Sequence, residues 1–243
     1  MPASSTEVVR ASSECMLETR HSDDSETTRA TLLLIGILSV PAARELRDTQ
    51  RHGYLQRSRF LCPALIEYRF VLSTLDWSSA DTNQSLQQEA QAASDLLFVD
   101  APNGFDFISH KVKLFIDWAV QRRQPFKYLL KTDDDASICL GGLLKELRLR
   151  YPTQRLYMGK AKLNIKVERD PSVRQYNSRF TKETGLTVYP PYAGGSGYVI
   201  SSDVAVALAD KVITDTSPLP FRHFPREDVR RRKDCETVDV HNP

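Results

Sequence analysis

Phe126-Lys-Tyr-Leu-Leu-Lys-Thr-Asp-Asp-Asp135 is an apolar run that ends abruptly in three consecutive carboxylates. An apolar run of about five residues flanked by turn or charge signals is typical of a buried parallel strand. Asp133, Asp134 and Asp135 should then emerge at the carboxyl end of this strand, which is the edge where open α/β sheets bind ligands. The stretch therefore predicts both a parallel sheet and the place of its functional site.

The three carboxylates also indicate a kind of ligand. Adjacent carboxylates repel one another and raise each other's pKa values. A hard divalent cation that prefers oxygen ligands offsets this repulsion most simply. A solvated acidic turn is the alternative, and the triplet alone does not separate the two interpretations.

Length and composition narrow the class of protein. The 243 residues are enough for one sizeable α/β domain with a buried core, and we expect a single domain over residues 31–243. With 33 basic and 31 acidic residues the net charge is only +2, so neither nucleic acid nor an anionic membrane surface is indicated as a partner. The four cysteines, Cys15, Cys62, Cys139 and Cys235, are far apart, so neither a zinc ribbon nor a dense disulfide framework is indicated, and one or two disulfides are possible.

The first part of the chain bears on targeting. Residues 1–30 are rich in Ser and Thr and poor in large apolar side chains, which predicts a disordered leader. The most apolar segment, 31–40, is too short for a bilayer that needs roughly twenty residues, so it is predicted to be a core strand. No signal-peptide pattern precedes it. We therefore expect any membrane anchor to lie outside this chain. The sequon Asn83-Gln-Ser85 can be glycosylated only in the secretory pathway.

Strand-like and helix-like patterns alternate along the chain, which predicts a parallel sheet with helices on both faces. Val112, Phe115, Ile116 and Ala119 recur at spacings of three and four, as expected for an amphipathic helix over 109–123. No regular structure is predicted for 161–187. The predicted strands are 31–40, 67–73, 95–99, 126–131 and 156–159. Besides the helix over 109–123, the predicted helices are 42–56, a short Gln/Ala-rich segment after residue 85, 140–150 and 202–212.

Three further features have both a functional and a structural interpretation. Arg44 and Arg47 lie one helical turn apart and could hold a phosphate, or could form an ordinary solvated helix face. Tyr189-Pro-Pro-Tyr-Ala-Gly-Gly-Ser-Gly-Tyr-Val-Ile-Ser201 is either a loop whose glycines let the backbone approach a ligand or a tight turn entering a strand. Glu227-Asp228 is either a surface ion-pair cluster or a general base that neighbouring positive charge keeps ionised.

Taken in order, these features resemble glycosyltransferase family 31, which includes β-1,3-galactosyltransferases and β-1,3-N-acetylglucosaminyltransferases. The resemblance covers about residues 32–229 and rests on Lys131-Thr-Asp-Asp-Asp135, the 189–201 stretch and Glu227-Asp-Val229. Lys111, Arg44, Arg47 and Thr49 match weaker family positions. Within the family, the run through the triplet and residues 143–150 are most similar to the galactosyltransferase that builds the glycosaminoglycan linker.

The resemblance implies a GT-A fold, an α/β architecture with a mostly parallel central sheet flanked by helices. It implies inverting transfer of galactose or N-acetylhexosamine from a UDP-sugar to a glycan or glycoprotein acceptor, with Mn²⁺ as the cofactor, in the Golgi lumen behind an N-terminal anchor. The implied metal ligands are Asp135 and His241, and the implied base is Asp228, next to Glu227. The implied donor-binding residues are Asp133, on the ribose side, Asp134, Arg44, Arg47, Lys111, Gly194 and Gly195.

The chain departs from the family pattern at three places, one of which is that His241 lies closer to Asp228 in the sequence than the family spacing. Two other functions are also consistent with its residues. Gln50 follows Thr49 where the family has tryptophan, and the glycine expected three residues after Asp228 is absent, so we expect a truncated or altered C-terminal end. An inactive relative that keeps the fold as a binding or scaffold protein is one alternative. A metal-dependent phosphodiesterase or phosphotransferase, which also uses carboxylates at strand ends, is the other.

Overall fold

In a computed structural model, the described residues of the protein are 31–56, 65–75, 80–173 and 176–210. The sheet, its helices and the pocket at its edge are formed by residues of these four ranges. The predicted leader and the segment that carries Glu227, Asp228 and His241 lie outside this part of the chain.

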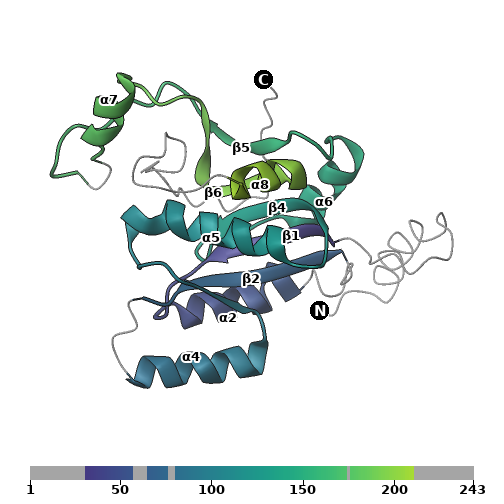
Figure 1. Cartoon of the computed structure of the whole chain (residues 1–243). Coiled ribbons are helices and arrows are strands. Elements are labelled where there is room, and N and C mark those ends of the chain that lie inside the picture. Colours follow the sequence, from purple (N-terminus) through teal and green to yellow (C-terminus); the bar gives the residue numbers. More distant parts are fainter. Residues whose placement is uncertain (1–30, 57–64, 76–79, 174–175, 211–243) are drawn as a thin grey trace.

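A six-stranded mixed sheet lies at the centre of the protein, with helices on both of its faces (Figure 1). The strand order is β3-β2-β1-β4-β6-β5; β1 pairs in parallel with β2 and β4, β2 pairs in parallel with β3, and β6 runs antiparallel to β4 and β5. The α/β prediction with a mostly parallel sheet is therefore confirmed. The strands are β1 (Thr31–Leu38), β2 (Ile66–Ser73), β3 (Leu96–Val99), β4 (Phe126–Asp133), β5 (Tyr157–Lys162) and β6 (Tyr192–Ser201).

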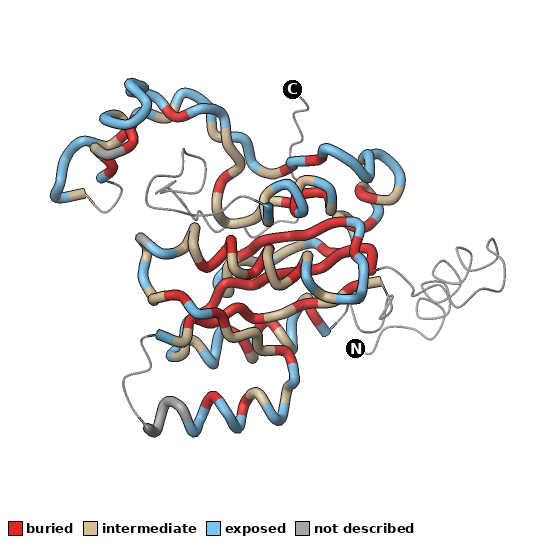
Figure 2. The backbone as a smooth tube through the Cα atoms, in the orientation of Figure 1, coloured by how far each residue is buried: buried red, intermediate tan, exposed pale blue. Residues whose placement is uncertain are grey.

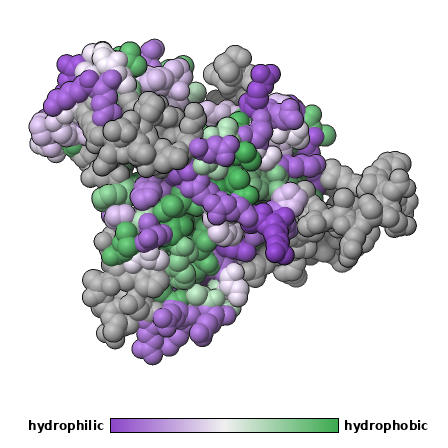
Figure 3. All heavy atoms as spheres, viewed as in Figure 1, coloured by the Kyte–Doolittle hydropathy of each residue, from purple (hydrophilic) through white to green (hydrophobic). Residues whose placement is uncertain are grey.

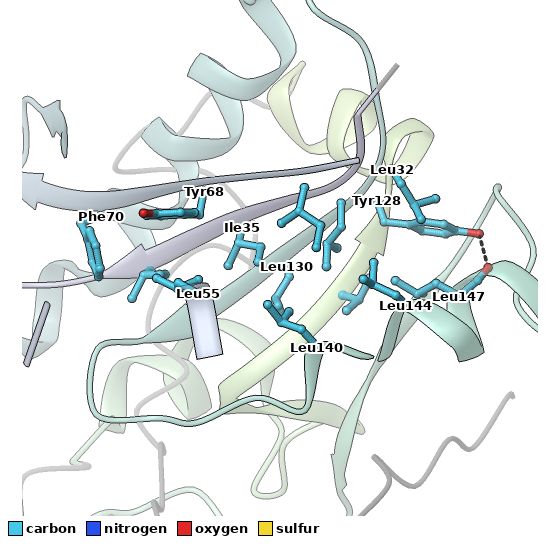
Figure 4. Close-up of a cluster of buried hydrophobic side chains, with 14 of the residues drawn as sticks. Leu32, Ile35, Leu55, Tyr68, Phe70, Tyr128, Leu130, Leu140, Leu144 and Leu147 are labelled. Carbon is cyan, nitrogen blue, oxygen red and sulfur yellow. Dashed lines mark hydrogen bonds between the residues drawn. The ribbon is translucent and has the colours of Figure 1, made fainter. Parts of the chain in front are cut away.

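Helices cover the two faces of the sheet and bury one apolar cluster on each. The helices are α2 (Arg44–His52), α4 (Ala80–Ala93), α5 (Ile108–Gln121), α6 (Leu140–Leu149), α7 (Ser178–Thr184) and α8 (Ser202–Ala209), and η2 (Phe105–Phe107) is a short 3₁₀ helix. Helices α5 and α8 contribute Phe115, Ile116 and Ala205 to one cluster. Helix α6 contributes Leu140, Leu144 and Leu147 to the other, where the Tyr128 hydroxyl donates to the Leu147 carbonyl at 3.3 Å (Figure 4).

Burial follows the strands at the centre of the sheet. All eight residues of β1 are buried, because strands pair with it on both sides and helices cover both faces (Figure 2). Hydrophilic side chains gather instead over α4 and α7 (Figure 3). The helices among the described residues include none with the length and hydropathy needed to span a bilayer.

The glycine-rich stretch forms a strand where the sequence predicted a loop before a strand. Strand β6 begins at Tyr192, so Gly194, Gly195 and Gly197 lie within it, and Gly197 pairs with Thr132 of β4. Small residues are required where β5 and β6 pair, because a Cβ added to Gly159 would lie 2.7 Å from the Ala193 Cβ. Pairing with two neighbouring strands satisfies the backbone of this segment and decides its conformation.

The segment 161–187 also contains structure that the sequence did not predict. The end of β5, two isolated bridges (Lys166 with Val188, and Glu168 with Tyr176) and helix α7 lie there. The Asn177 side chain accepts a hydrogen bond from the Phe180 amide and caps α7. Because isolated bridges join single residue pairs and leave no repeating pattern, a search for local periodicity does not find them.

Candidate functional site

A pocket of about 360 Å³ opens where β1, β2 and β4 end. Their carboxyl ends share one edge of the sheet because these strands are parallel. The acidic triplet is therefore at the edge predicted from the sequence. The lining residues are Leu38, Ser39, Val40, Ser73, Pro102, Asn103, Gly104, Phe105, Ile108, Lys111, Asp133, Asp134 and Asp135.

The acidic triplet forms a tight turn at the end of β4. Asp133 is still in register with Leu38 of β1, and the Asp134 amide extends this pairing by donating to the Leu38 carbonyl at 3.1 Å. The Ala136 amide then donates to the Asp133 carbonyl at 3.2 Å and closes the turn. We call residues 133–136 the acidic turn.

Lys131 neutralises the first carboxylate of the acidic turn. Its ammonium group is buried and donates to Asp133 Oδ1 at 2.8 Å and to the Gly195 carbonyl at 2.6 Å. The Thr132 hydroxyl donates to the Ser196 carbonyl at 2.9 Å and makes a second link to β6. Of the predicted donor residues, Gly195 is joined to Asp133 through Lys131, Gly194 lies next to Lys160 and Lys162 of β5, and neither of them lines the pocket.

The other two carboxylates have fewer protein partners. Burial raises the pKa of Asp134, a hydrogen bond with the Ser39 side chain opposes this shift, and the charge of Asp135 adds to it. Asp134 Oδ2 is buried and has no hydrogen-bond partner among the described residues. Asp135 is exposed at the edge of the pocket. The acidic turn therefore presents one buried carboxylate oxygen and one exposed carboxylate to a ligand.

These oxygens fit a divalent cation that is held partly by a phosphate ligand. Within the described ranges, no three Asp, Glu, His or Cys side chains form a group that could hold a metal ion by themselves. A small hard cation is often bound by one or two carboxylates together with substrate phosphates, and it needs no complete protein cage. Asp134 Oδ2 and Asp135 can supply such carboxylates. The predicted ligand His241 lies outside the described residues, so its role stays a prediction.

Lys111 faces the acidic turn across the pocket. The lysine is only 6% exposed, and its Nζ donates to the Ser39 carbonyl at 2.5 Å. Burial lowers the pKa of Lys111 to about 8, although the charges of Asp134 and Asp133 oppose the shift. A buried cation beside the carboxylates can bind an anion in this pocket, as its predicted donor-binding role requires.

The lowered pKa of Lys111 predicts how stability depends on pH. Between pH 8 and the ordinary lysine pKa of 10.5, the unfolded chain binds more protons at this residue than the folded chain. The free energy of unfolding should therefore rise with pH in this window, on the order of 1 kcal/mol per pH unit from this group. Denaturant unfolding at pH 8 and pH 9.5 measures this rise.

The Lys111→Met variant should lose this contribution, and Lys145→Met, which removes an exposed lysine of α6, should keep it. Equal pH profiles for Lys111→Met and wild type would contradict the assignment.

Arg44 and Arg47 do not lie on one solvent face, so that part of the phosphate hypothesis is wrong. Arg44 is exposed and pairs with Asp48 at 3.7 Å. Arg47 is fully buried, because Glu89 of α4 accepts from its Nε at 2.8 Å and from its Nη2 at 2.6 Å. Its remaining bonds go to Ser39 Oγ at 3.0 Å and to the carbonyls of Val40 and Pro41 at 2.6 and 3.3 Å.

These bonds use all five N–H donors of the Arg47 guanidinium. A direct contact between Arg47 and a phosphate would require breaking one of them. The structure therefore gives Arg47 a role in holding the segment after β1, which lines the pocket, and the donor-binding role of Arg44 stays a prediction.

Sequence reasoning missed several residues that build the site. Asn103 and Ser39 both line the pocket, although neither is among the site residues predicted from the sequence. Gln50 stands out in the sequence only as a departure from the family pattern, but its side chain contacts the acidic turn. A polar residue directly after a buried strand is a usable signal for Ser39, which follows β1. The predicted base Asp228 and its neighbour Glu227 lie outside the described residues.

Comparisons with known proteins agree with this architecture. The family model described as galactosyltransferase matches residues 46–229. The chain is 26% identical to hydroxyproline O-galactosyltransferase GALT2 of Arabidopsis thaliana over 197 residues. This alignment covers 81% of this chain and 27% of that protein. It is 32% identical to beta-1,3-galactosyltransferase 5 of Pan paniscus over 136 residues, and this alignment covers 56% of this chain and 44% of that protein.

A third relative has a different donor in its name. The chain is 32% identical to UDP-GalNAc:beta-1,3-N-acetylgalactosaminyltransferase 2 of Danio rerio over 128 residues. This alignment covers 52% of this chain and 25% of that protein. The matched parts are less than half of the length of these three relatives.

Proposed function

Because the chain belongs to the galactosyltransferase family, glycosyltransferase family 31, we propose that it is an inverting β-1,3-hexosyltransferase that uses a UDP-sugar and Mn²⁺. The transferred sugar is galactose or an N-acetylhexosamine, and the acceptor is a hydroxyl of a glycan or glycoprotein. The relatives named after galactose and after N-acetylgalactosamine support this range of donors.

One observation carries the proposal: the pocket brings Lys111 and the acidic turn together at the carboxyl edge of the sheet. A UDP-sugar has a diphosphate that needs positive charge and can share a divalent cation with carboxylates. Lys111 supplies positive charge on one side, and Asp134 and Asp135 supply cation ligands on the other. The pocket volume of about 360 Å³ is within the range of small-molecule sites.

The residues of the chain have separate roles in the proposed reaction. Bound Mn²⁺ would supply Lewis acidity, which stabilises the negative charge on the leaving UDP. Lys131 holds Asp133 in place and limits repulsion within the triplet. Lys111, while protonated, adds positive charge beside the diphosphate. Asp228 accepts the proton of the acceptor hydroxyl as that oxygen attacks C1 of the sugar from the face opposite UDP, and the configuration at C1 inverts.

Release of UDP by the purified protein tests this function. We expect Mn²⁺-dependent UDP release from at least one donor in a panel of UDP-galactose, UDP-N-acetylglucosamine and UDP-N-acetylgalactosamine. The Asp228→Asn variant should release UDP about 10²–10⁴-fold more slowly, because it has lost its general base.

The outcomes separate the alternatives. Equal rates in Asp228→Asn and wild type, or no release by either, would defeat the proposed transferase activity. UDP binding without release from any donor supports an inactive, fold-retaining binding protein. Hydrolysis of simple phosphate esters without a preference for UDP supports a phosphodiesterase or phosphotransferase.

We also propose that the protein acts on the lumenal side of the Golgi membrane. Cys139, next to α6, forms a disulfide, a bond that persists in oxidising compartments. The sequon at Asn83 is in α4. Sensitivity of the cellular protein to an N-glycosidase tests the assignment, and Asn83→Gln is the control. A band that the glycosidase does not shift would count against lumenal glycosylation at this sequon.

A further inference from the structure

Helix α2 packs against the protein with polar rather than apolar side chains. Its buried residues are Arg47 and Gln50, which lie three positions apart and therefore on one face of the helix. A helix that docks on a core usually presents an apolar stripe. The contacts of these two residues therefore show what α2 does for the site.

Gln50 holds the acidic turn through two hydrogen bonds. Its Nε2 donates to the Asp134 carbonyl at 2.6 Å and to the Ala136 carbonyl at 2.7 Å. These carbonyls lie on the two sides of Asp135, and both N–H donors of the amide are in use. A reversed amide would place Oε1 against two carbonyl oxygens, so the hydrogen-bond pattern fixes the orientation of the side chain.

Arg47 holds α2 against the segment after β1, which also lines the pocket. Its guanidinium binds Ser39, Val40 and Pro41 after β1 and is anchored by Glu89 of α4. Gln50 therefore projects from a helix that is already fixed to the segment after β1. Through these two residues, α2 links the wall that contains Ser39 and Val40 to the wall formed by the acidic turn.

The Gln50 side chain both stabilises the acidic turn and costs free energy, because among the described residues its Nε2 forms hydrogen bonds and its Oε1 forms none. Gln50 is only 6% exposed, and its Oε1 has no hydrogen-bond partner in the part of the chain that the structure describes. A buried acceptor without a partner costs about 1–3 kcal/mol. A leucine of similar size would avoid this cost but could not bind the two carbonyls.

We propose that Gln50 is a positioning residue, which fixes the backbone on both sides of Asp135 and so holds this carboxylate at the pocket. Its effect on the order of the turn is independent of the proposed function, whereas its effect on ligand binding rests on that function. The two effects are measured separately.

Hydrogen exchange of the metal-free protein tests the effect on the turn. In Gln50→Leu, protection of the Asp134 and Ala136 amides should fall at least about tenfold, because the backbone that forms their hydrogen bonds loses its anchor. The matched control is Tyr128→Phe, which removes a buried hydroxyl from the opposite end of β4, where it contacts the carbonyls of Leu147, Tyr151 and Pro152. The control should keep the protection of the acidic turn, and unchanged protection in Gln50→Leu would overturn the proposal.

Titration calorimetry of UDP in the presence of Mn²⁺ tests the effect on binding. Gln50→Leu should bind UDP about 10–100-fold more weakly, the usual cost of losing a residue that orients a metal ligand. Gln50→Glu, which puts a carboxylate against the same carbonyls, should weaken binding in the same direction, and Tyr128→Phe should bind like wild type. Wild-type affinity in both Gln50 variants contradicts the proposal. Failure of wild type to bind UDP contradicts the proposed function instead, and hydrogen exchange then still decides the role of Gln50.

Discussion

The Asp135→Ala variant should release UDP from its donor at least about 100-fold more slowly than wild type, a loss of about 2.7 kcal/mol of transition-state stabilisation. Asp135 is the exposed member of the acidic turn and lines the pocket beside Asp134. In the proposed reaction it holds the cation on which the leaving diphosphate depends. Initial rates of UDP release at saturating Mn²⁺ measure the effect.

Folding controls separate this loss from general damage. Because Asp135 is exposed, its replacement should change the free energy of unfolding by no more than about 0.5 kcal/mol. Asp210→Ala removes another exposed carboxylate, directly after α8, and should release UDP like wild type. Similar rates for Asp135→Ala and Asp210→Ala would show that the acidic turn does not hold the catalytic cation.

Replacing Arg47 with methionine should lower the free energy of unfolding by about 3–5 kcal/mol. Among the described residues, the change leaves the Glu89 carboxylate, whose side chain is 3% exposed, with Arg51 at 2.8 Å as its one ionic partner. It also removes donors from Ser39 and from the carbonyls of Val40 and Pro41. Equilibrium unfolding in urea at pH 7 measures the loss.

The matched control for Arg47 is on the same helix. Arg44→Met removes an exposed arginine whose ion pair with Asp48 is 3.7 Å long, and it should cost no more than about 1 kcal/mol. The double variant Arg47→Met/Glu89→Leu should recover part of the loss, because no buried charge is then left unpaired. Equal destabilisation by Arg47→Met and Arg44→Met would contradict the buried ion pair.

Stability at acidic pH should depend on the same pair. Burial alone would raise the pKa of Glu89, but the hydrogen bonds from Arg47 and Arg51 outweigh burial and lower it. A lowered carboxyl pKa contributes stability above the pKa of an unfolded glutamate, and this contribution is lost as the pH falls through the folded value. The stability difference between wild type and Glu89→Gln should therefore shrink as the pH is lowered, and a constant difference would contradict this linkage.

The elements that could be predicted from the sequence are those with a strong local pattern. Strand β4 is an apolar run with an acidic end, and α5 has apolar residues at spacings of three and four, of which Val112, Phe115, Ile116 and Ala119 are buried as predicted. The position of the acidic turn at the pocket follows from strand direction alone, since parallel strands share a carboxyl edge. Local pattern and strand direction are therefore sufficient to predict which edge of the sheet carries the pocket.

The parts that could not be predicted depend on partners far away in the sequence. Arg44 and Arg47 have the same side-chain chemistry, but only Arg47 has the buried partner Glu89, which lies 42 residues further along the chain. Gln50 contacts carbonyls 84 and 86 residues away, which no pattern within α2 indicates. The glycine-rich segment of β6 is in a strand because β4 and β5 pair with the residues on both sides of Gly194 and Gly195, although the local sequence is typical of a turn.

Calorimetric titration of the wild-type protein with UDP, with and without Mn²⁺, tests the central claim most directly. We expect Mn²⁺ to tighten UDP binding at least about tenfold, because the cation joins the diphosphate to the acidic turn. Chelation of the metal should reverse this gain, and inorganic phosphate should not compete at similar concentrations. Equal UDP affinity with and without Mn²⁺, or equal affinity for UDP and simple phosphate esters, would contradict a UDP-sugar site at Asp133–Asp135.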